Sequence, residues 1–255
     1  IEKQNQQVQN SNNQLDASFI AMSASIVASL VKITSAVEEG INKYNSYKNS
    51  MNALKKTAEA TGNSMSDVQD VIKDVNKLKL LDEGDLNSSI KNLLLYGYTA
   101  EQAADILNVL QDAAVGNRQA NYSLSEAVRV TTEGIRMENS VLSDAAGVQK
   151  NISKMYEEYA ATIGKSSDAL TQAEKAQAVY NGIMEEASIF TGAAEEIAQG
   201  YQGQQAQLNA TNLELSRTIG ESMIPVMTQY NSIQLSITKG LTEFISNHKS
   251  ATSGV

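Results

Sequence analysis

Proline, the residue that disrupts a helix interior most strongly, occurs once in this chain of 255 residues, at Pro225. Aromatic residues make up 5% of the chain, and tryptophan is absent. Sheets are built largely from β-branched and aromatic runs, which are scarce here, while the commonest helix breaker is almost missing. We therefore predict an all-α fold, with long N-terminal and C-terminal helices flanking a multi-helix cluster and packing as a bundle or coiled coil.

Start signals for short helices recur through the middle of the chain. In a capping box, a serine or threonine and a glutamate or glutamine three residues later satisfy free amides at a helix start. The candidate starts are the boxes Ser66–Gln69, Thr99–Gln102, Ser123–Glu126 and Thr171–Glu174, together with a single cap at Asp85. Apolar residues at helical spacing follow each of them, and Gly97 is a candidate stop. These signals predict a multi-helix domain over residues 63–200.

The N-terminal arm, residues 1–62, has a different pattern. Its apolar residues recur at steps of three, four and seven, which places them on one narrow face of a long helix. The stripe contains Leu15, Phe19, Ile26, Leu30, Ile33, Val37, Tyr44 and Met51. Burying so thin a stripe contributes less than ordering the backbone costs. We predict that this arm associates with copies of itself; packing on a core within its own chain is the alternative.

A second long helix is expected over residues 201–255, with a flexible tail at its end. Its apolar residues again keep helical spacing. Pro225 lacks an amide hydrogen and crowds the preceding turn, so it is expected to kink or break this helix. Gly220, five residues earlier, is the second candidate for such a kink or break.

The sequence offers no support for catalysis. There is no cysteine, which excludes thiol nucleophiles and zinc–thiolate sites, and the single histidine, His248, lies in a polar tail. Neighbouring glutamates such as Glu185 and Glu186 point about 100° apart on a helix, so such a pair cannot clamp one proton or metal. The formal net charge of −9 argues against direct nucleic-acid binding. We expect no enzyme activity, no cofactor and no metal site.

Several short motifs follow one another between Tyr96 and Ala187. They are G-Y-T-x-E-Q-A from Gly97, S-L-S-E-A-V from Ser123 with a glycine after it, L-S-D-A-A-G-V from Leu142, G-K-S from Gly164, and L-T-x-A-E-K-A-Q-A-x-Y-N-G-I from Leu170. Downstream, LELSRTIGESMIPVMTQYNSI contains Gly220 and Pro225. In this order, over about half of the chain, these motifs resemble the helical domain of phage tail tape-measure proteins.

The resemblance implies a structural virion protein of a long-tailed phage or prophage. Members of this family set tail length, because tube subunits polymerise around them, and they leave the tube ahead of the DNA at ejection. The implied partners are further copies of the chain, tail-tube and distal tail proteins and tail assembly chaperones, with transient host-membrane contact on ejection. The implied location is the tail lumen, and the bacterial cytoplasm during assembly. The repetitive body of a whole tape measure is missing, so we expect a segment of a longer chain.

Two other classes of protein compete with this interpretation. A membrane-active, pore-forming-like helical protein is supported only by the apolar stretch from Ala17 to Val37. The uncharged part of it, residues 17–31, covers roughly 22 Å as a helix, which is short of the ~30 Å hydrocarbon core. A cytoplasmic coiled-coil scaffold is the other alternative, and the broken heptad pattern after Ala58 argues against it.

Overall fold

The computed structural model describes residues 32–247, and all regular structure in this range is helical, without a strand. The predicted all-α fold is therefore confirmed. The described residues form two units. The first, which we call the crossing unit, comprises residues 32–44 and 215–247; the second, the helical cluster, comprises Asn45–Glu214.

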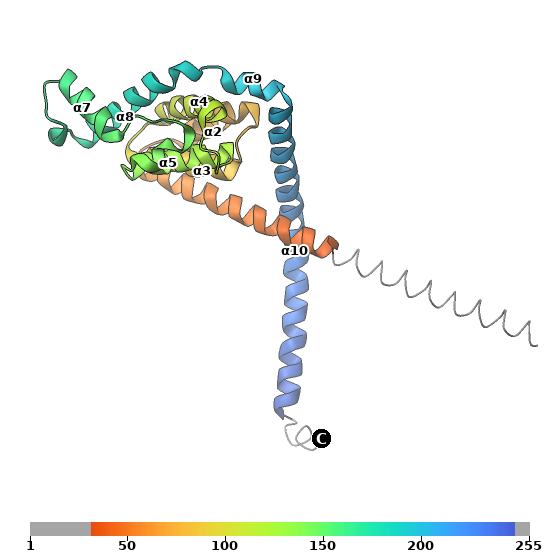
Figure 1. The fold of residues 1–255 in the computed structure, drawn as a ribbon. Coiled ribbons are helices and arrows are strands. Elements are labelled where there is room, and N and C mark those ends of the chain that lie inside the picture. Colours follow the sequence, from red (N-terminus) through yellow and green to blue (C-terminus); the bar gives the residue numbers. More distant parts are fainter. Residues whose placement is uncertain (1–31, 248–255) are drawn as a thin grey trace, which may run out of the picture. The chain divides into compact units, whose positions relative to one another are not determined.

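Two long helices bracket a series of short ones along the chain (Figure 1). The long helices are α1, residues 32–60, and α10, Tyr201–Asn247. The shorter helices are α2 Met65–Val75, α3 Glu83–Tyr96, α4 Ala100–Asn117, α5 Leu124–Arg136, α6 Ser140–Ser143, α7 Ile152–Thr162, α8 Gln172–Ala187 and α9 Ala193–Gln199. Single 3₁₀ turns lie between some of them: η1 Asn76–Leu78, η2 Asp144–Ala146, η3 Ser167–Ala169 and η4 Ser188–Phe190.

Three of the predicted capping boxes are present and start α4, α5 and α8. The side chains of Thr99, Ser123 and Thr171 each accept from the backbone amide three residues later. The glutamine or glutamate at that position accepts in return from the cap residue's own amide. Because both partners lie within four residues, local sequence is enough to place these helix starts.

Two predicted starts are wrong by a few residues. The N-cap of α2 is Ser64, whose hydroxyl accepts from the Asp67 amide at 3.0 Å, rather than Ser66. The N-cap of α3 is Asp82, whose carboxylate accepts from the amides of Gly84 and Asp85, so Asp85 lies in the first turn. Several polar residues at each start can act as a cap, and the cap is the one whose backbone is extended.

The core of the helical cluster is largely aliphatic and draws most of its residues from α3, α4, α7 and α8, with fewer from α2 and α5. Leu93, Ile106, Leu107 and Val179 are fully buried in it. The second half of α1 contributes Leu54 to the same core, so the cluster begins before residue 63, where the sequence placed its boundary.

Two buried hydroxyls in this cluster make hydrogen bonds between distant segments. The Tyr98 hydroxyl donates to the Ala176 carbonyl at 3.0 Å, which joins the start of α4 to α8. The Thr131 hydroxyl donates to the Ser143 carbonyl and accepts from the Ala146 amide, which ties α5 to the α6–η2 segment. Such pairing removes most of the cost of burying a polar group.

The C-terminal helix starts at Tyr201, as the sequence predicts, and runs without interruption to Asn247. Neither Gly220 nor Pro225 ends it, so the alternative of a break at these residues is wrong. A proline inside a helix removes one hydrogen bond, and the remaining bonds of a 47-residue helix hold the segment together across that gap.

Candidate interaction surface

The crossing unit is organised around two glycines, one on each helix. A Cβ atom on Gly40 of α1 would lie 2.6 Å from the Ser216 carbonyl oxygen of α10, and one on Gly220 would overlap the Gly40 carbonyl. Both glycines are buried. The two backbones therefore approach more closely than any residue with a side chain would allow, and Gly220 is a contact residue within the helix.

A side-chain hydrogen bond lies beside this crossing. The hydroxyl of Tyr44 donates to Oε1 of Glu221 at 3.0 Å. Because this carboxylate accepts from the neutral phenol and would repel the phenolate, it raises the pKa of Tyr44. The bond joins residues 177 positions apart in the sequence and links the two helices beside the crossing.

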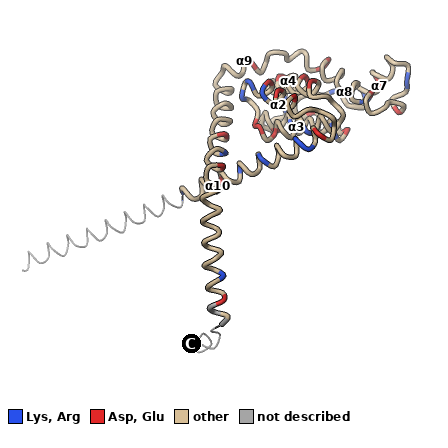
Figure 2. Tube along the Cα trace, turned by 180° about the vertical axis from the view of Figure 1, so that it is seen from behind, with Lys and Arg blue, Asp and Glu red and all other residues tan. Residues whose placement is uncertain are grey.

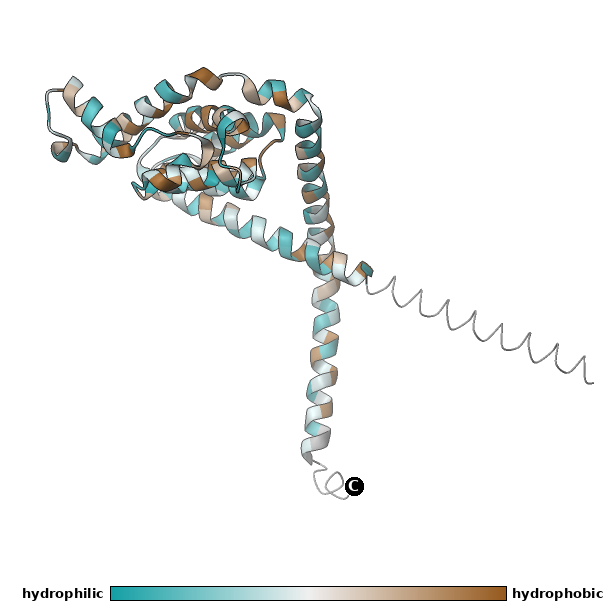
Figure 3. Cartoon of the chain, in the orientation of Figure 1, coloured by the Kyte–Doolittle hydropathy of each residue, from teal (hydrophilic) through white to brown (hydrophobic). Residues whose placement is uncertain are grey.

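From the crossing onward, α10 carries an apolar stripe that is exposed over most of its length, visible as brown residues along the helix in Figure 3. We call it the α10 stripe; its residues are Ile219, Met223, Val226, Tyr230, Ile233, Ile237 and Leu241. Up to Ile237 the steps between them are 4, 3, 4, 3 and 4, the spacing of a coiled-coil seam. Ile233 is 59% exposed and Ile237 63% exposed.

This part of α10 is nearly free of charge. From Ser222 to Asn247 the charged residues are Lys239 and Glu243, as Figure 2 shows. The chain as a whole carries a formal charge of −9, which repels a second copy. Along the α10 stripe that repulsion is weak, because Lys239 and Glu243 cancel, and an apolar seam with little charge suits the packing of two copies.

The predicted N-terminal stripe lies partly outside the described residues: Leu15, Phe19, Ile26 and Leu30 precede residue 32. Within the described part, Ile33 is exposed and Val37 is half-buried, both in the crossing unit. Tyr44 takes part in the crossing through Glu221. Met51 packs against the core of the helical cluster. Self-association through this arm stays a prediction. Met51, the last residue of the predicted stripe, already makes its contacts within the chain.

The two neighbouring glutamates Glu185 and Glu186 bind different donors. Glu185 accepts from the ammonium of Lys150 at 2.8 Å. Glu186 instead accepts from the backbone amides of Gln149 and Lys150, at 2.7 and 2.9 Å. These contacts fasten the segment before α7 to α8.

Within residues 32–247 no group of three or more histidine, cysteine, aspartate or glutamate side chains is placed to hold a metal ion. In the same range, no helix has both the length and the apolar character that a membrane span needs. His248 lies outside the described residues, as does most of the apolar stretch that supports the membrane-active alternative.

Comparisons of the chain with protein-family models, with curated proteins and with solved structures found no match.

Proposed function

We propose that this chain is a segment of a phage or prophage tail tape measure, a structural protein that occupies the tail-tube lumen and sets tail length. In this proposal it takes part in tail assembly and in genome ejection, and it has no enzymatic activity. It lies in the virion tail and, during assembly, in the bacterial cytoplasm. Its partners are further copies of itself, tail-tube and distal tail proteins and assembly chaperones.

The observation that supports this most is where the family-like motif residues lie. Gly97 ends α3 with a positive φ of 115°, and Thr99 caps α4. Gly147 ends η2 with a φ of 90°. Gly182 of α8 lies against Met155 of α7, where a Cβ would be 2.5 Å from that side chain. The motifs thus coincide with helix ends and close contacts, the positions that specify a fold, rather than with a site for chemistry.

The α10 helix provides a second line of support. Its 47 residues correspond to roughly 70 Å at 1.5 Å per residue. Extended helices suit a protein around which tube subunits polymerise, because their length is proportional to residue number. The exposed α10 stripe further supports assembly with other copies, since burying a large aliphatic side chain contributes about 1.5–3 kcal/mol. Association itself costs about 4–15 kcal/mol, so several stripe residues have to be buried on each copy.

The proposal is tested in a phage or prophage that carries the parent gene. Mass spectrometry of purified tails should detect this chain, and tails emptied by triggered ejection should have lost it. Its absence from intact tails would overturn the proposal. An exposed coiled-coil seam would then favour the cytoplasmic scaffold.

The length of the tail provides a quantitative test. A tandem duplication of residues 222–242 adds three heptads and should lengthen the tail by roughly 32 Å. Electron micrographs of many tails from each strain would measure the difference. A synonymous recoding of the same segment serves as the control. If tails that contain the longer chain keep the wild-type length, this segment is not part of the ruler.

Self-association through the α10 stripe has its own test. Ile233→Asp together with Ile237→Asp places unpaired charges in the seam, and the dissociation constant should rise by about 100-fold or more. Ser232→Asp with Ser236→Asp adds the same charge beside the stripe and should change it far less. Sedimentation velocity of the purified chains measures the constants. If wild type is monomeric at every concentration, or if both double variants weaken association equally, the α10 stripe is not the contact.

A further inference from the structure

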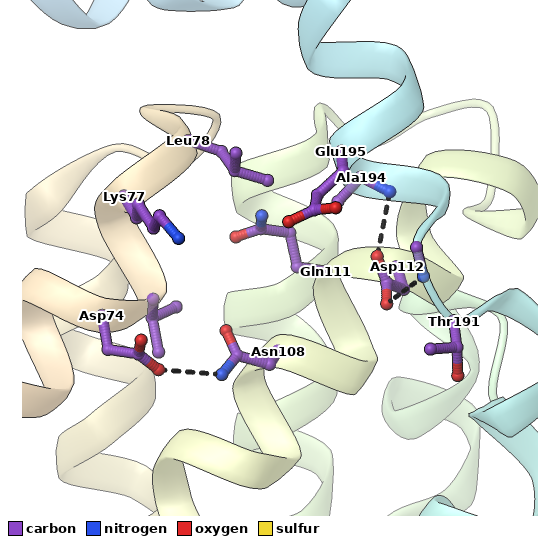
Figure 4. Close-up of a pocket in the computed structure, with 11 residues that line it drawn as sticks. Asp74, Lys77, Leu78, Asn108, Gln111, Asp112, Thr191, Ala194 and Glu195 are labelled. Atoms are coloured by element: carbon purple, nitrogen blue, oxygen red, sulfur yellow. Dashed lines mark hydrogen bonds between the residues drawn. The ribbon is translucent and has the colours of Figure 1, made fainter.

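A cavity of about 350 Å³ opens in the helical cluster between the end of α2, η1, α4 and α9 (Figure 4). Most of the polar groups around it come from Asp74, Lys77, Gln111, Asp112 and Glu195. A volume of this size accommodates a small ligand or one long side chain. Neither the fold nor the proposed tail function assigns a role to it.

Gln111 is the residue that needs an explanation. Its side chain is 3% exposed, and its carbonyl oxygen Oε1 has no hydrogen-bond partner among the described residues. Figure 4 shows this side chain projecting from α4 into the space between Lys77 of η1 and Glu195 of α9. Buried polar side chains are normally paired, so an orphaned acceptor directed into a cavity indicates a missing donor.

The charges around the cavity specify what kind of donor would fit. Three carboxylates, from Asp74, Asp112 and Glu195, line the cavity together with one ammonium, that of Lys77, which leaves a formal charge of −2. Opposite charge favours a cation over a neutral donor of the same size.

Existing bonds hold two of these carboxylates in place. Asp112 accepts from the amides of Gly192 and Ala194, each at 2.9 Å, and Asp74 accepts from the Asn108 side-chain amide at 3.1 Å. A carboxylate has about four acceptor positions, so each of them retains capacity for a further donor.

We propose that this cavity binds an alkylammonium group. Three N–H donors on one nitrogen match the Gln111 carbonyl together with the flanking carboxylates, and the methylene stem can lie against Val75 and Leu78, which also line the cavity. A free diamine and a lysine side chain of a partner protein share this chemistry. The proposal is independent of the tail function, because it rests on the cavity alone.

The binding test uses the full 255-residue chain and 1,4-diaminobutane as the probe. Titration followed by the side-chain amide resonance of Gln111 should be saturable, with calorimetry giving the dissociation constant. 1,4-Butanediol has the same length without charge and should not bind, and sodium chloride at equal ionic strength should not shift the resonance. Equal shifts with the diol, or a titration that does not saturate, would overturn the proposal.

Gln111→Met keeps the volume and removes the acceptor. It should weaken diamine binding by about tenfold or more, the scale of a lost hydrogen bond to a charged group. Gln69→Met, on the exposed face of α2, is the matched control and should leave binding unchanged. Unchanged affinity in a folded Gln111→Met chain contradicts the proposal.

Two neighbouring glutamates on α9 provide a second pair of variants, and this test does not depend on whether Gln111→Met folds. Glu195→Gln removes a carboxylate from the cavity, whereas Glu196→Gln makes the same change at an exposed residue that does not line it. The first should weaken diamine binding several-fold and the second should not. If both variants weaken it equally, only the general charge of the chain attracts the diamine.

The source of the ammonium group is distinguished by a second probe, N-acetyl-lysine methylamide. Tighter binding of the diamine indicates a free small molecule, and tighter binding of the lysine derivative indicates a partner's side chain. Failure of both probes to bind overturns the site itself.

Discussion

The helical cluster and the crossing unit carry apolar residues at similar helical spacing, yet the two regions use them differently. In the cluster, Leu93 and Ile106 are fully buried, because short helices joined by tight turns fold back over one another. In the crossing unit, Ile233 and Leu241 are 59% and 60% exposed along a helix that continues to Asn247. An apolar repeat therefore becomes part of a core only where another segment of the chain covers it; along this part of α10 it stays exposed.

The largest expected effect comes from removing a buried side chain from the cluster. Leu107→Ala should reduce the free energy of unfolding by about 2–5 kcal/mol, since it leaves a cavity in a packed core. Leu241→Ala removes the same atoms from an exposed position and should change it by less than about 0.5 kcal/mol where the chain is monomeric. Urea unfolding followed by circular dichroism measures both. Equal losses of unfolding free energy would mean that the α10 stripe is covered within the same molecule. The cluster and the crossing unit would then use their apolar residues in the same way.

A second, smaller effect separates the crossing from the rest of α10. Gly220→Ala introduces a methyl group where the Gly40 carbonyl lies and should destabilise the chain by about 1–3 kcal/mol. Gly240→Ala is in the same helix with no atom within 4 Å of the new Cβ, so it should stabilise by about 0.5–1 kcal/mol through helix propensity. Thermal melts of the two variants should shift in opposite directions. Two upward shifts would contradict the close crossing.

The smallest effect concerns the ends of the short helices. The 11-residue helix α2 depends on its cap more than a 47-residue helix would, because its end groups are a larger share of its backbone. Ser64→Ala should cost about 1 kcal/mol of unfolding free energy. Ser66→Ala, two residues later on the exposed first turn, should cost less than about 0.5 kcal/mol. Chemical denaturation measures both losses. A larger loss of unfolding free energy for Ser66→Ala than for Ser64→Ala would support Ser66 as the helix cap, as the sequence alone suggested.

The sequence predicted the starts of α4, α5 and α8 correctly, placed those of α2 and α3 a few residues late, and missed other helices. Thr99, Ser123 and Thr171 were recognisable because a capping box is complete within four residues. The helices α7, Ile152–Thr162, and α9, Ala193–Gln199, were not predicted, because Asn151 makes no side-chain cap bond and α9 begins at a glycine without one. Short helices without such a signal are held by the surfaces on which they pack, which the sequence pattern does not show.

The sequence predicted least well the helix crossing and the cavity around Gln111. Gly220 was noticed as an irregularity of one helix, whereas its role depends on Gly40, 180 positions earlier in the chain. The orphaned Gln111 carbonyl and the cavity around it had no sequence signal at all, since glutamine is common in helices of this composition. The cavity that Gln111 lines forms only because the fold brings side chains from α2, η1 and α9 next to α4.

By itself the sequence determined that this chain is helical, where α4, α5 and α8 begin, and that its long C-terminal helix starts at Tyr201. Helix propensity, capping and apolar spacing act over a few residues, so they can be read without knowing the fold. Only the tertiary structure decided that Gly220 is a contact rather than a break, that Met51 packs inward while Ile233 stays exposed, and that Gln111 faces a cavity. Burial and close approach depend on which distant segment arrives, and no local pattern contains that information.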